Sequence, residues 1–130
     1  MADTISDFIT IIRNTSRVRN EFCTARYSKV HWSIAQILKD EGYIRAVTEN
    51  KDENGFKNIV IELKYVDDVP VITGIKRWSK PGCRAYFGYS EIPRVLNGLG
   101  LGILTTSSGF LRDREARQRK IGGELICTVW

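Results

Sequence analysis

The sequence has few of the residues that build metal sites and disulfide frameworks. It contains one histidine, His31, and three widely spaced cysteines, Cys23, Cys83 and Cys127. A zinc site or a disulfide scaffold needs several such residues at short spacings, so the sequence predicts neither. We expect reduced, partly buried thiols and no metal or other cofactor.

Long apolar runs are also missing. No segment approaches the ~18 apolar residues that a membrane-spanning helix needs. Residues 1–14 carry acids where a secretory signal has basic residues, and their apolar positions are spaced rather than continuous. The sequence therefore predicts a cytoplasmic protein without a membrane partner.

Motifs for catalysis are absent too. The glycines of Gly98–Gly102 precede an expected strand and lack the G-x-G-x-x-G spacing of a dinucleotide-binding loop. A nucleophile elbow would need glycine where Thr105 stands, and the only histidine lies far away in sequence. The carboxylates show no spacing that selects a general acid and base. We expect no enzyme activity and no catalytic residue.

The sequence does have an uneven distribution of positive charge. The formal net charge is +5, but residues 76–120 hold ten Lys and Arg against three acidic residues, a net of +7. A basic segment of this kind favours a polyanionic partner, although it also suits a solvated surface.

The first half predicts an α-β-α-β-β order. Apolar residues at helical spacing indicate a first helix, with Asp3 and Asp7 near its start and Arg13 and Arg17 toward its end. Four further elements are expected: an extended piece over Phe22–Arg26, a helix capped by Ser28 and ended by Gly42, and strands over Tyr43–Thr48 and Lys57–Leu63.

The second half is expected to be mainly β. It predicts a strand over Val71–Trp78, a tight turn over Ser79–Gly82 in which Gly82 is free to take a positive φ, and a strand over Arg84–Phe87. An apolar strand that ends at Thr105–Ser108, a short helix capped by Asp113, and a strand over Leu125–Trp130 are expected to follow. The fold class is thus α+β with two closely packed subdomains, residues 1–66 and 67–130.

The second half also combines three kinds of group that suit RNA. Basic residues can hold phosphates, while an aromatic ring and small hydroxyls can reach bases and sugars of irregular RNA. Lys80 and Arg84 surround the Pro-Gly turn and Tyr86 follows, whereas the hydroxyl run Thr105–Ser108 precedes a second basic cluster. The same residues also fit a protein-interaction module whose basic face meets an acidic partner without direct RNA contact.

The order of residues resembles one family closely. The run from Lys80 to Trp130, KPGCRAYFGYSEIPRVLNGLGLGILTTSSGFLRDREARQRKIGGELICTVW, is similar to the eighth protein of the small ribosomal subunit, of the bacterial and organellar type. The start, DTISDFITIIRN, with the Ser-Lys pair at residues 28 and 29, fits the same family. The resemblance spans the whole chain.

The resemblance implies a structural protein without catalysis. It implies direct binding to the central domain of small-subunit ribosomal RNA at an irregular helix, and support of subunit assembly in the cytoplasm. It also implies neighbouring small-subunit proteins as partners, with the fifth protein among them, and no homo-oligomer in the working state.

The resemblance, together with the basic and hydroxyl clusters read from the sequence, gives the residues expected to contact RNA. In the first half these are Arg13, Asn14, Ser28, Lys29 and His31. In the second half they are Lys80, Pro81, Gly82, Arg84, Tyr86, Thr105, Thr106, Ser107, Ser108, Gly109, Arg112, Arg117, Gly122, Gly123 and Glu124. The family often has lysine at position 108, so Ser108 implies one phosphate contact fewer and a salt dependence shallower by about 0.7 to 0.9 in slope.

Overall fold

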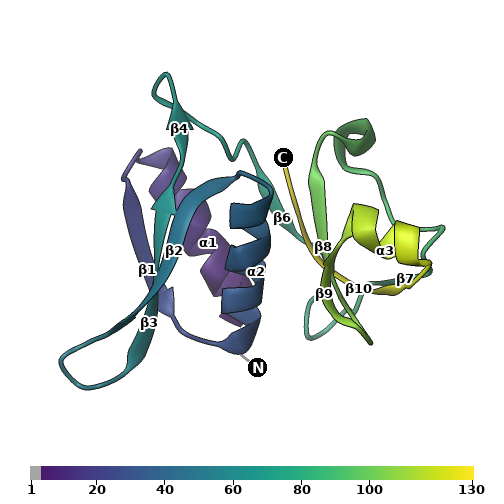
Figure 1. Cartoon of the computed structure of the whole chain (residues 1–130), viewed down its shortest axis with the longest axis horizontal. Coiled ribbons are helices and arrows are strands. Elements are labelled where there is room, and N and C mark those ends of the chain that lie inside the picture. Colours follow the sequence, from purple (N-terminus) through teal and green to yellow (C-terminus); the bar gives the residue numbers. More distant parts are fainter. Residues whose placement is uncertain (1–3) are drawn as a thin grey trace. The chain divides into compact units, whose positions relative to one another are not determined.

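The computed structural model describes residues 4–130 and divides into two compact units, which we call the N-terminal unit, Thr4–Thr73, and the C-terminal unit, Gly74–Trp130. The N-terminal unit mixes helices and strands, and the C-terminal unit is mostly sheet with a short α-helix. The expected α+β class is therefore confirmed (Figure 1). Asp3, expected near the start of the first helix, lies outside the described residues. None of the helices in residues 4–130 is long and apolar enough to cross a membrane.

The N-terminal unit has the expected order of helices and strands. Its main elements are α1 (Thr4–Arg17), β1 (Phe22–Arg26), α2 (Lys29–Asp40), β2 (Ile44–Lys51) and β3 (Lys57–Leu63). The strands form an antiparallel sheet in the order β1-β3-β2. Cys23 and Val47 both pair with Ile61, so these three residues form one buried row across the sheet.

Both helices pack on one face of this sheet (Figure 1). The strand β1 alternates between exposed and buried residues, which leaves one face for the core. Phe8, Ile9 and Ile12 of α1 recur at helical spacing and are almost fully buried, as are Ile34 and Leu38 of α2. Helical periodicity therefore predicted the core of this unit correctly.

One small hairpin of the N-terminal unit was not predicted. Its strands are β4 (Tyr65–Val66) and β5 (Val69–Pro70). Backbone bonding continues past it, because the Val71 amide donates to the Lys64 carbonyl at 3.0 Å. The hairpin belongs to the N-terminal unit, so the units divide between Thr73 and Gly74, whereas the sequence suggested a division after residue 66.

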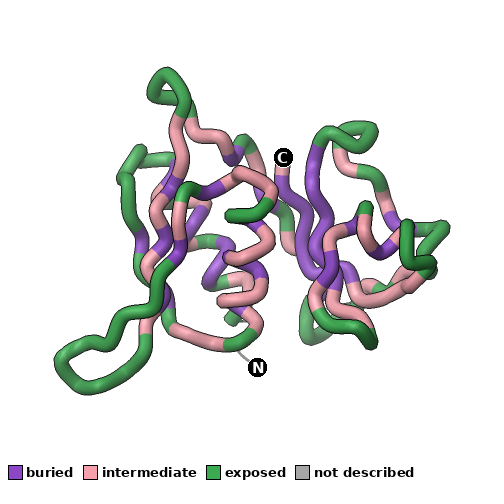
Figure 2. Tube along the Cα trace, viewed as in Figure 1, coloured by how far each residue is buried: buried purple, intermediate pink, exposed green. Residues whose placement is uncertain are grey.

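The C-terminal unit is built on a five-stranded antiparallel sheet. The strand order is β6-β10-β8-β9, and β7 also pairs with β10. The elements are β6 (Ile75–Arg77), β7 (Tyr86–Phe87), the 3-10 helix η1 (Val95–Gly98), β8 (Leu101–Thr106), β9 (Gly109–Arg112), α3 (Asp113–Arg119) and β10 (Gly123–Val129). One cluster of its core consists of Ile92, Leu104, Leu111, Ala116 and Leu125, against which Trp78 and Phe87 pack. Figure 2 shows β8 and β10 as buried along most of their length.

Two expectations for the C-terminal unit need correction, and one strand was missed. The strand expected over Val71–Trp78 is limited to Ile75–Arg77, and β9 was missed. Gly82 is not among the glycines with a positive φ, so the turn bridged by Lys80 and Cys83 forms without that conformation. Asp113 does not cap α3: Arg112 is the N-cap, without a side-chain hydrogen bond, and Asp113 is buried as the first helical residue.

Candidate nucleic-acid interface

The hydroxyl run forms the end of one strand and the turn that follows it. Thr105 and Thr106 are the last residues of β8, and the exposed Ser107 and Ser108 connect it to Gly109 at the start of β9. The Thr106 hydroxyl donates to the Gly109 carbonyl at 2.9 Å and accepts from the Ser108 amide at 3.1 Å. A positive φ of 95° at Gly109 completes the turn, a conformation that glycine adopts without strain. Thr106 therefore holds the turn, while Ser107 and Ser108 project into solvent.

Three candidate residues from three strands lie in one row. Glu124 of β10 pairs with Tyr86 of β7 on one side and with Thr105 of β8 on the other. Side chains directly opposite each other in antiparallel strands point to the same face of a sheet. Tyr86 is 70% exposed, so the row presents an accessible aromatic ring beside a carboxylate and a hydroxyl. Residues far apart in the sequence are thus brought together.

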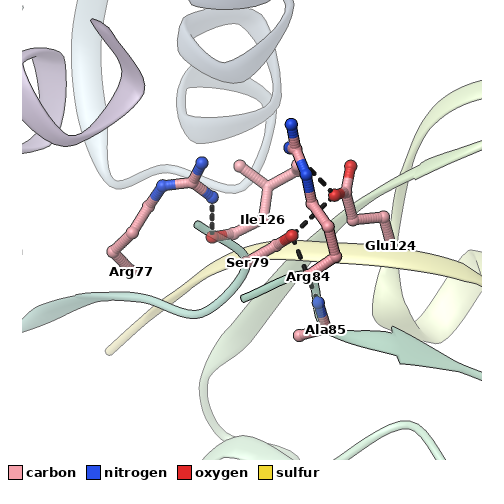
Figure 3. Close-up of polar contacts among 6 residues, drawn as sticks. All are labelled: Arg77, Ser79, Arg84, Ala85, Glu124 and Ile126. Carbon is pink, nitrogen blue, oxygen red and sulfur yellow. Dashed lines mark hydrogen bonds and ion pairs between the residues drawn. The ribbon is translucent and has the colours of Figure 1, made fainter. Parts of the chain in front are cut away.

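A buried serine orders the residues around this row (Figure 3). The Ser79 hydroxyl donates to Glu124 Oε2 at 2.6 Å and accepts from the Ala85 amide at 3.2 Å. Arg84 Nη1 approaches the same Oε2 at 3.3 Å, and the Arg84 side chain is half exposed. Glu124 is therefore held by one neutral and one cationic donor, and Arg84 keeps part of its guanidinium in solvent.

The turn between Ser79 and Arg84 is closed by two backbone hydrogen bonds. The amides of Lys80 and Cys83 each donate to the other residue's carbonyl at 3.0 Å. Pro81 occupies the first central position, where its fixed φ favours a turn, and all four turn residues are exposed. Nearby, Arg77 Nη1 donates to the Ile126 carbonyl at 2.8 Å (Figure 3). The turn presents the cationic Lys80 on a fixed backbone.

The paired glycines serve the packing of strands. A Cβ atom on Gly123 would lie 2.4 Å from the Thr105 carbonyl oxygen, and one on Gly122 would lie 2.5 Å from that of Phe87. Real Cβ atoms do not approach so closely, so these positions require glycine for β7 and β8 to reach β10. Their role in the structure is to permit the row of Tyr86, Glu124 and Thr105.

Arg117 differs from the expectation that it faces RNA. Its Nη1 pairs with Asp113 Oδ2 at 2.9 Å, and its Nη2 donates to the carbonyls of Ile92 at 3.3 Å and Pro93 at 3.0 Å. Asp113 Oδ1 in turn accepts from the Gly102 amide at 3.2 Å. This largely buried pair ties α3 to β8 and to the segment before η1. Arg117 is thus held within the fold, and we leave it out of the proposed interface.

The other basic residues near α3 are more accessible. Arg112 and Arg119 both pair with Glu115, at 3.8 Å and 3.0 Å, and their side chains are 40% and 52% exposed. Arg114 and Lys120 are exposed. Lys120 also ends α3 in the left-handed conformation, with a φ of 57°. A solvated, positive surface therefore follows the hydroxyl turn along the chain.

The candidates in the N-terminal unit do not form one cluster. Ser28 caps α2 as expected, since its hydroxyl accepts from the His31 amide at 3.0 Å, and Lys29 is exposed in the first turn. Arg13 and Asn14 lie near the end of α1. His31 connects the start of α2 with Thr4, the first described residue of α1. At 1.5 Å per residue, Thr4 lies about 14 Å along α1 from Arg13 and Asn14. Lys29 is thus placed at the opposite end of α1 from Arg13 and Asn14.

His31 is likewise held inside the fold. The side chain is buried and its ring stacks on Phe8, with 4.6 Å between the centroids and an angle of 5°. Nδ1 lies 2.9 Å from the Arg26 carbonyl oxygen, and Nε2 lies 3.2 Å from that of Thr4. Both ring nitrogens face backbone groups inside the unit, so the imidazole is not available at the surface.

Sequence reasoning missed Ser79 and misread Asp113. Ser79 was assigned only to a turn, yet it is fully buried and connects three parts of the candidate interface. Its position just before Lys-Pro-Gly carries no signal of burial. Asp113 and Arg117 have the i, i+4 spacing of a helical ion pair, so the sequence did contain a signal for this pair.

Comparison with known proteins agrees with this arrangement of elements. The family model for ribosomal protein S8 matches residues 3–130. The chain is 52% identical over 130 residues to the small ribosomal subunit protein uS8 of Opitutus terrae, with all of both chains covered. It is 50% identical to that of Anaeromyxobacter dehalogenans, with 98% of this chain and 97% of the other covered, and 48% identical to the uS8c protein of Tupiella akineta, with 98% of each covered. The S8 family consists of structural ribosomal proteins rather than enzymes, which confirms the expectation of a protein without catalysis. On the length and level of these matches, the chain belongs to the ribosomal protein S8 family.

Proposed function

We propose that this chain is a structural protein of the small ribosomal subunit that binds the central domain of small-subunit ribosomal RNA and supports assembly of the subunit. The observation that carries the proposal is the row of Tyr86, Glu124 and Thr105, which lies beside the exposed Ser107 and Ser108. An accessible ring can stack on an unpaired base, and hydroxyls can bond to base edges or to ribose 2′-hydroxyls.

The cationic and anionic residues around the row have different roles in RNA binding. Lys80 and Arg84 lie on the neighbouring turn and can neutralise phosphates, which gives affinity but no sequence preference. Glu124 repels phosphate, and its carboxylate accepts hydrogen bonds only, so it favours the N–H groups of a base. This combination supports an irregular RNA element, because a regular A-form helix hides its base edges in a deep, narrow groove.

The C-terminal unit is the main RNA-binding part in this proposal. Gly109, Arg112 and the exposed turn residues Pro81 and Gly82 belong to the same proposed surface. The N-terminal unit contributes Arg13, Asn14, Ser28 and Lys29 as secondary contacts. Among neighbouring proteins of the subunit, we propose the fifth as a partner.

The proposed function is tested by binding to a labelled fragment of the central domain. We expect specific binding that weakens as the salt concentration rises, because phosphate contacts release counterions. An unrelated RNA of equal length is the control. Equal affinity for both RNAs would contradict specific recognition.

A second experiment separates RNA binding from binding to protein alone. Small subunits from cells that produce the tagged chain are sedimented before and after treatment with ribonuclease. We expect the chain to sediment with the subunits and to be released by ribonuclease. A complex that survives the treatment would favour a basic protein-interaction module without RNA contact.

A further inference from the structure

None of the residues that line one pocket of the N-terminal unit is assigned to RNA binding. The pocket has a volume of about 220 Å³. It is lined by Arg19, Glu21, Arg45, Glu62, Leu63, Tyr65 and Asp68, which come from the segment after α1, from β2 and β3, and from the β4–β5 hairpin.

The backbone of the pocket is well fixed. The Leu63 amide donates to the Glu21 carbonyl at 2.8 Å, and the Tyr65 hydroxyl donates to the Asn20 carbonyl at 2.7 Å. Arg19 and Asp68 have φ angles of 60° and 63°, in the left-handed region that residues other than glycine occupy rarely. Such conformations persist when surrounding contacts hold them. The pocket walls are therefore defined by contacts between separate segments.

The residues that line the pocket carry more negative than positive charge. Arg45 and Glu62 form an ion pair at 3.9 Å. Within residues 4–130, no ion pair involves Glu21, Asp68 or Arg19. Two unpaired carboxylates thus face a single unpaired guanidinium, although the chain as a whole carries a net charge of +5.

Tyr65 forms one wall of the pocket. Burial raises the pKa of the Tyr65 phenol, and Cys23 and Glu21 add to the increase, whereas Arg19 opposes it. Burial is the main cause, so the phenol side of the pocket is partly withdrawn from water.

Four exposed apolar residues are sequence neighbours of residues that line the pocket. Val66 and Val69 face each other across the β4–β5 hairpin, and Val18 and Phe22 flank the Arg19–Glu21 segment. Each of the four is 54–66% exposed. Exposed apolar groups beside polar ones are a common feature of protein–protein contact sites.

We propose that the pocket and these four apolar residues form a docking surface for a neighbouring protein that inserts a lysine or arginine side chain between Glu21 and Asp68. Charge complementarity selects this occupant, because the two unpaired carboxylates attract a cation and repel a polyanion. Leu63 and the ring of Tyr65, which line the pocket, contact the apolar stem of the inserted side chain. The inference rests on the proposed assembly into the small subunit, since that assembly supplies the neighbour.

Photo-crosslinking in purified small subunits tests the proposal. The chain is produced with p-benzoylphenylalanine at Val66, and in a control at Phe56, an exposed apolar residue outside the pocket. We expect the Val66 probe to give a protein–protein product that survives ribonuclease. The product should be lost in the Glu21→Lys, Asp68→Lys double variant and retained in Glu53→Lys, which reverses an exposed charge outside the pocket. Circular dichroism confirms that each variant is folded.

The remaining outcomes overturn the proposal. A crosslink from Val66 to RNA, a product unaffected by the double charge reversal, or a product that forms only from Phe56 would each contradict docking at the pocket. If the chain does not sediment with small subunits, the proposed function and this inference both fail. If it does sediment but gives no ribonuclease-resistant product from Val66, this inference alone fails.

Discussion

The hydroxyl of Ser79 donates to the carboxylate of Glu124 over 2.6 Å. Ser79 is fully buried, and Glu124, whose side chain is 13% exposed, stands in one row with the exposed Tyr86 and with Thr105. The same Ser79 oxygen accepts from the Ala85 amide, next to Arg84. One buried hydroxyl thus fixes both the carboxylate and the end of the basic turn.

Removing this hydroxyl is expected to weaken RNA binding. A hydrogen bond to a charged group contributes about 1.5 to 3 kcal/mol, so Ser79→Ala should lower the free energy of unfolding by roughly 2 kcal/mol. RNA affinity should fall about fivefold, or about 1 kcal/mol, because Glu124 and Arg84 lose their fixed arrangement. Urea unfolding and filter binding measure the two effects. Thr128→Val is the control, because the buried Thr128 hydroxyl accepts from Trp78 Nε1 and Thr128 is not a member of the row. Normal affinity in folded Ser79→Ala would refute the role.

Tyr86→Ala tests the stacking contact. Tyr86 is 70% exposed, so its removal should leave the thermal midpoint nearly unchanged. Stacking on one base contributes about 1 to 3 kcal/mol, and Tyr86→Phe should keep most of it. Tyr89→Ala, at the other exposed tyrosine of this unit, should bind normally. If both alanine variants bind RNA like the original chain, Tyr86 is not a contact.

Ser107→Ala tests the hydroxyl turn. Thr106 holds the backbone of the turn, so the exposed Ser107 can be changed without loss of structure. We expect the affinity for the central-domain fragment to fall by about 1 kcal/mol, and the affinity for unrelated RNA to stay constant. Ser90→Ala, at another exposed serine of the same unit, provides the comparison in the same binding assay. Equal losses for both RNAs would mean that Ser107 does not contribute to specificity.

The sequence was sufficient for the N-terminal helices and sheet because their signals are local and repeated. Apolar residues at helical spacing and a serine N-cap indicated α1 and α2, and β1 and β3 occur at their expected bounds. The β4–β5 hairpin and β9 were not found, because segments of two to four residues contain too few alternations to reveal a strand.

The candidate interface was harder to predict because it depends on register. Tyr86, Glu124 and Thr105 become neighbours only through the pairing of β7, β10 and β8. The burial of Ser79, His31 and Arg117 likewise results from contacts between distant segments, which one sequence does not show. Residue type predicted the kind of chemistry, and tertiary packing determined which residues reach the surface.

The Asp113–Arg117 pair is expected to be important for stability. Arg117→Ala would leave the carboxylate of Asp113 buried without its cation, and breaking such a pair reduces stability by about 3 to 5 kcal/mol. Arg119→Ala is the matched control on the same helix, because its pair with Glu115 is exposed and should contribute less than about 1 kcal/mol. Urea unfolding of both variants measures the difference. Equal stabilities of the two variants would show that the Asp113–Arg117 pair contributes no more than the exposed Arg119–Glu115 pair.

The buried thiol of Cys127 predicts a loss of stability in alkali. Burial raises the pKa of Cys127 from 9.0 to about 12, and Arg77 lowers it by a smaller amount. Below pH 9 the thiol is protonated in both folded and unfolded chains. Between pH 9 and 12 the unfolded chain releases this proton and the folded chain keeps it, so the free energy of unfolding falls as the pH rises.

The prediction is checked by urea unfolding at pH 8, 9 and 10. The original chain should lose stability faster over this range than Cys127→Ala, whose lower absolute stability does not affect the slope. Cys83→Ala should have the slope of the original chain, because the Cys83 thiol is exposed. Parallel slopes for the original chain and Cys127→Ala would mean that the Cys127 thiol titrates alike in the folded and unfolded states, and that its burial does not protect it from ionisation.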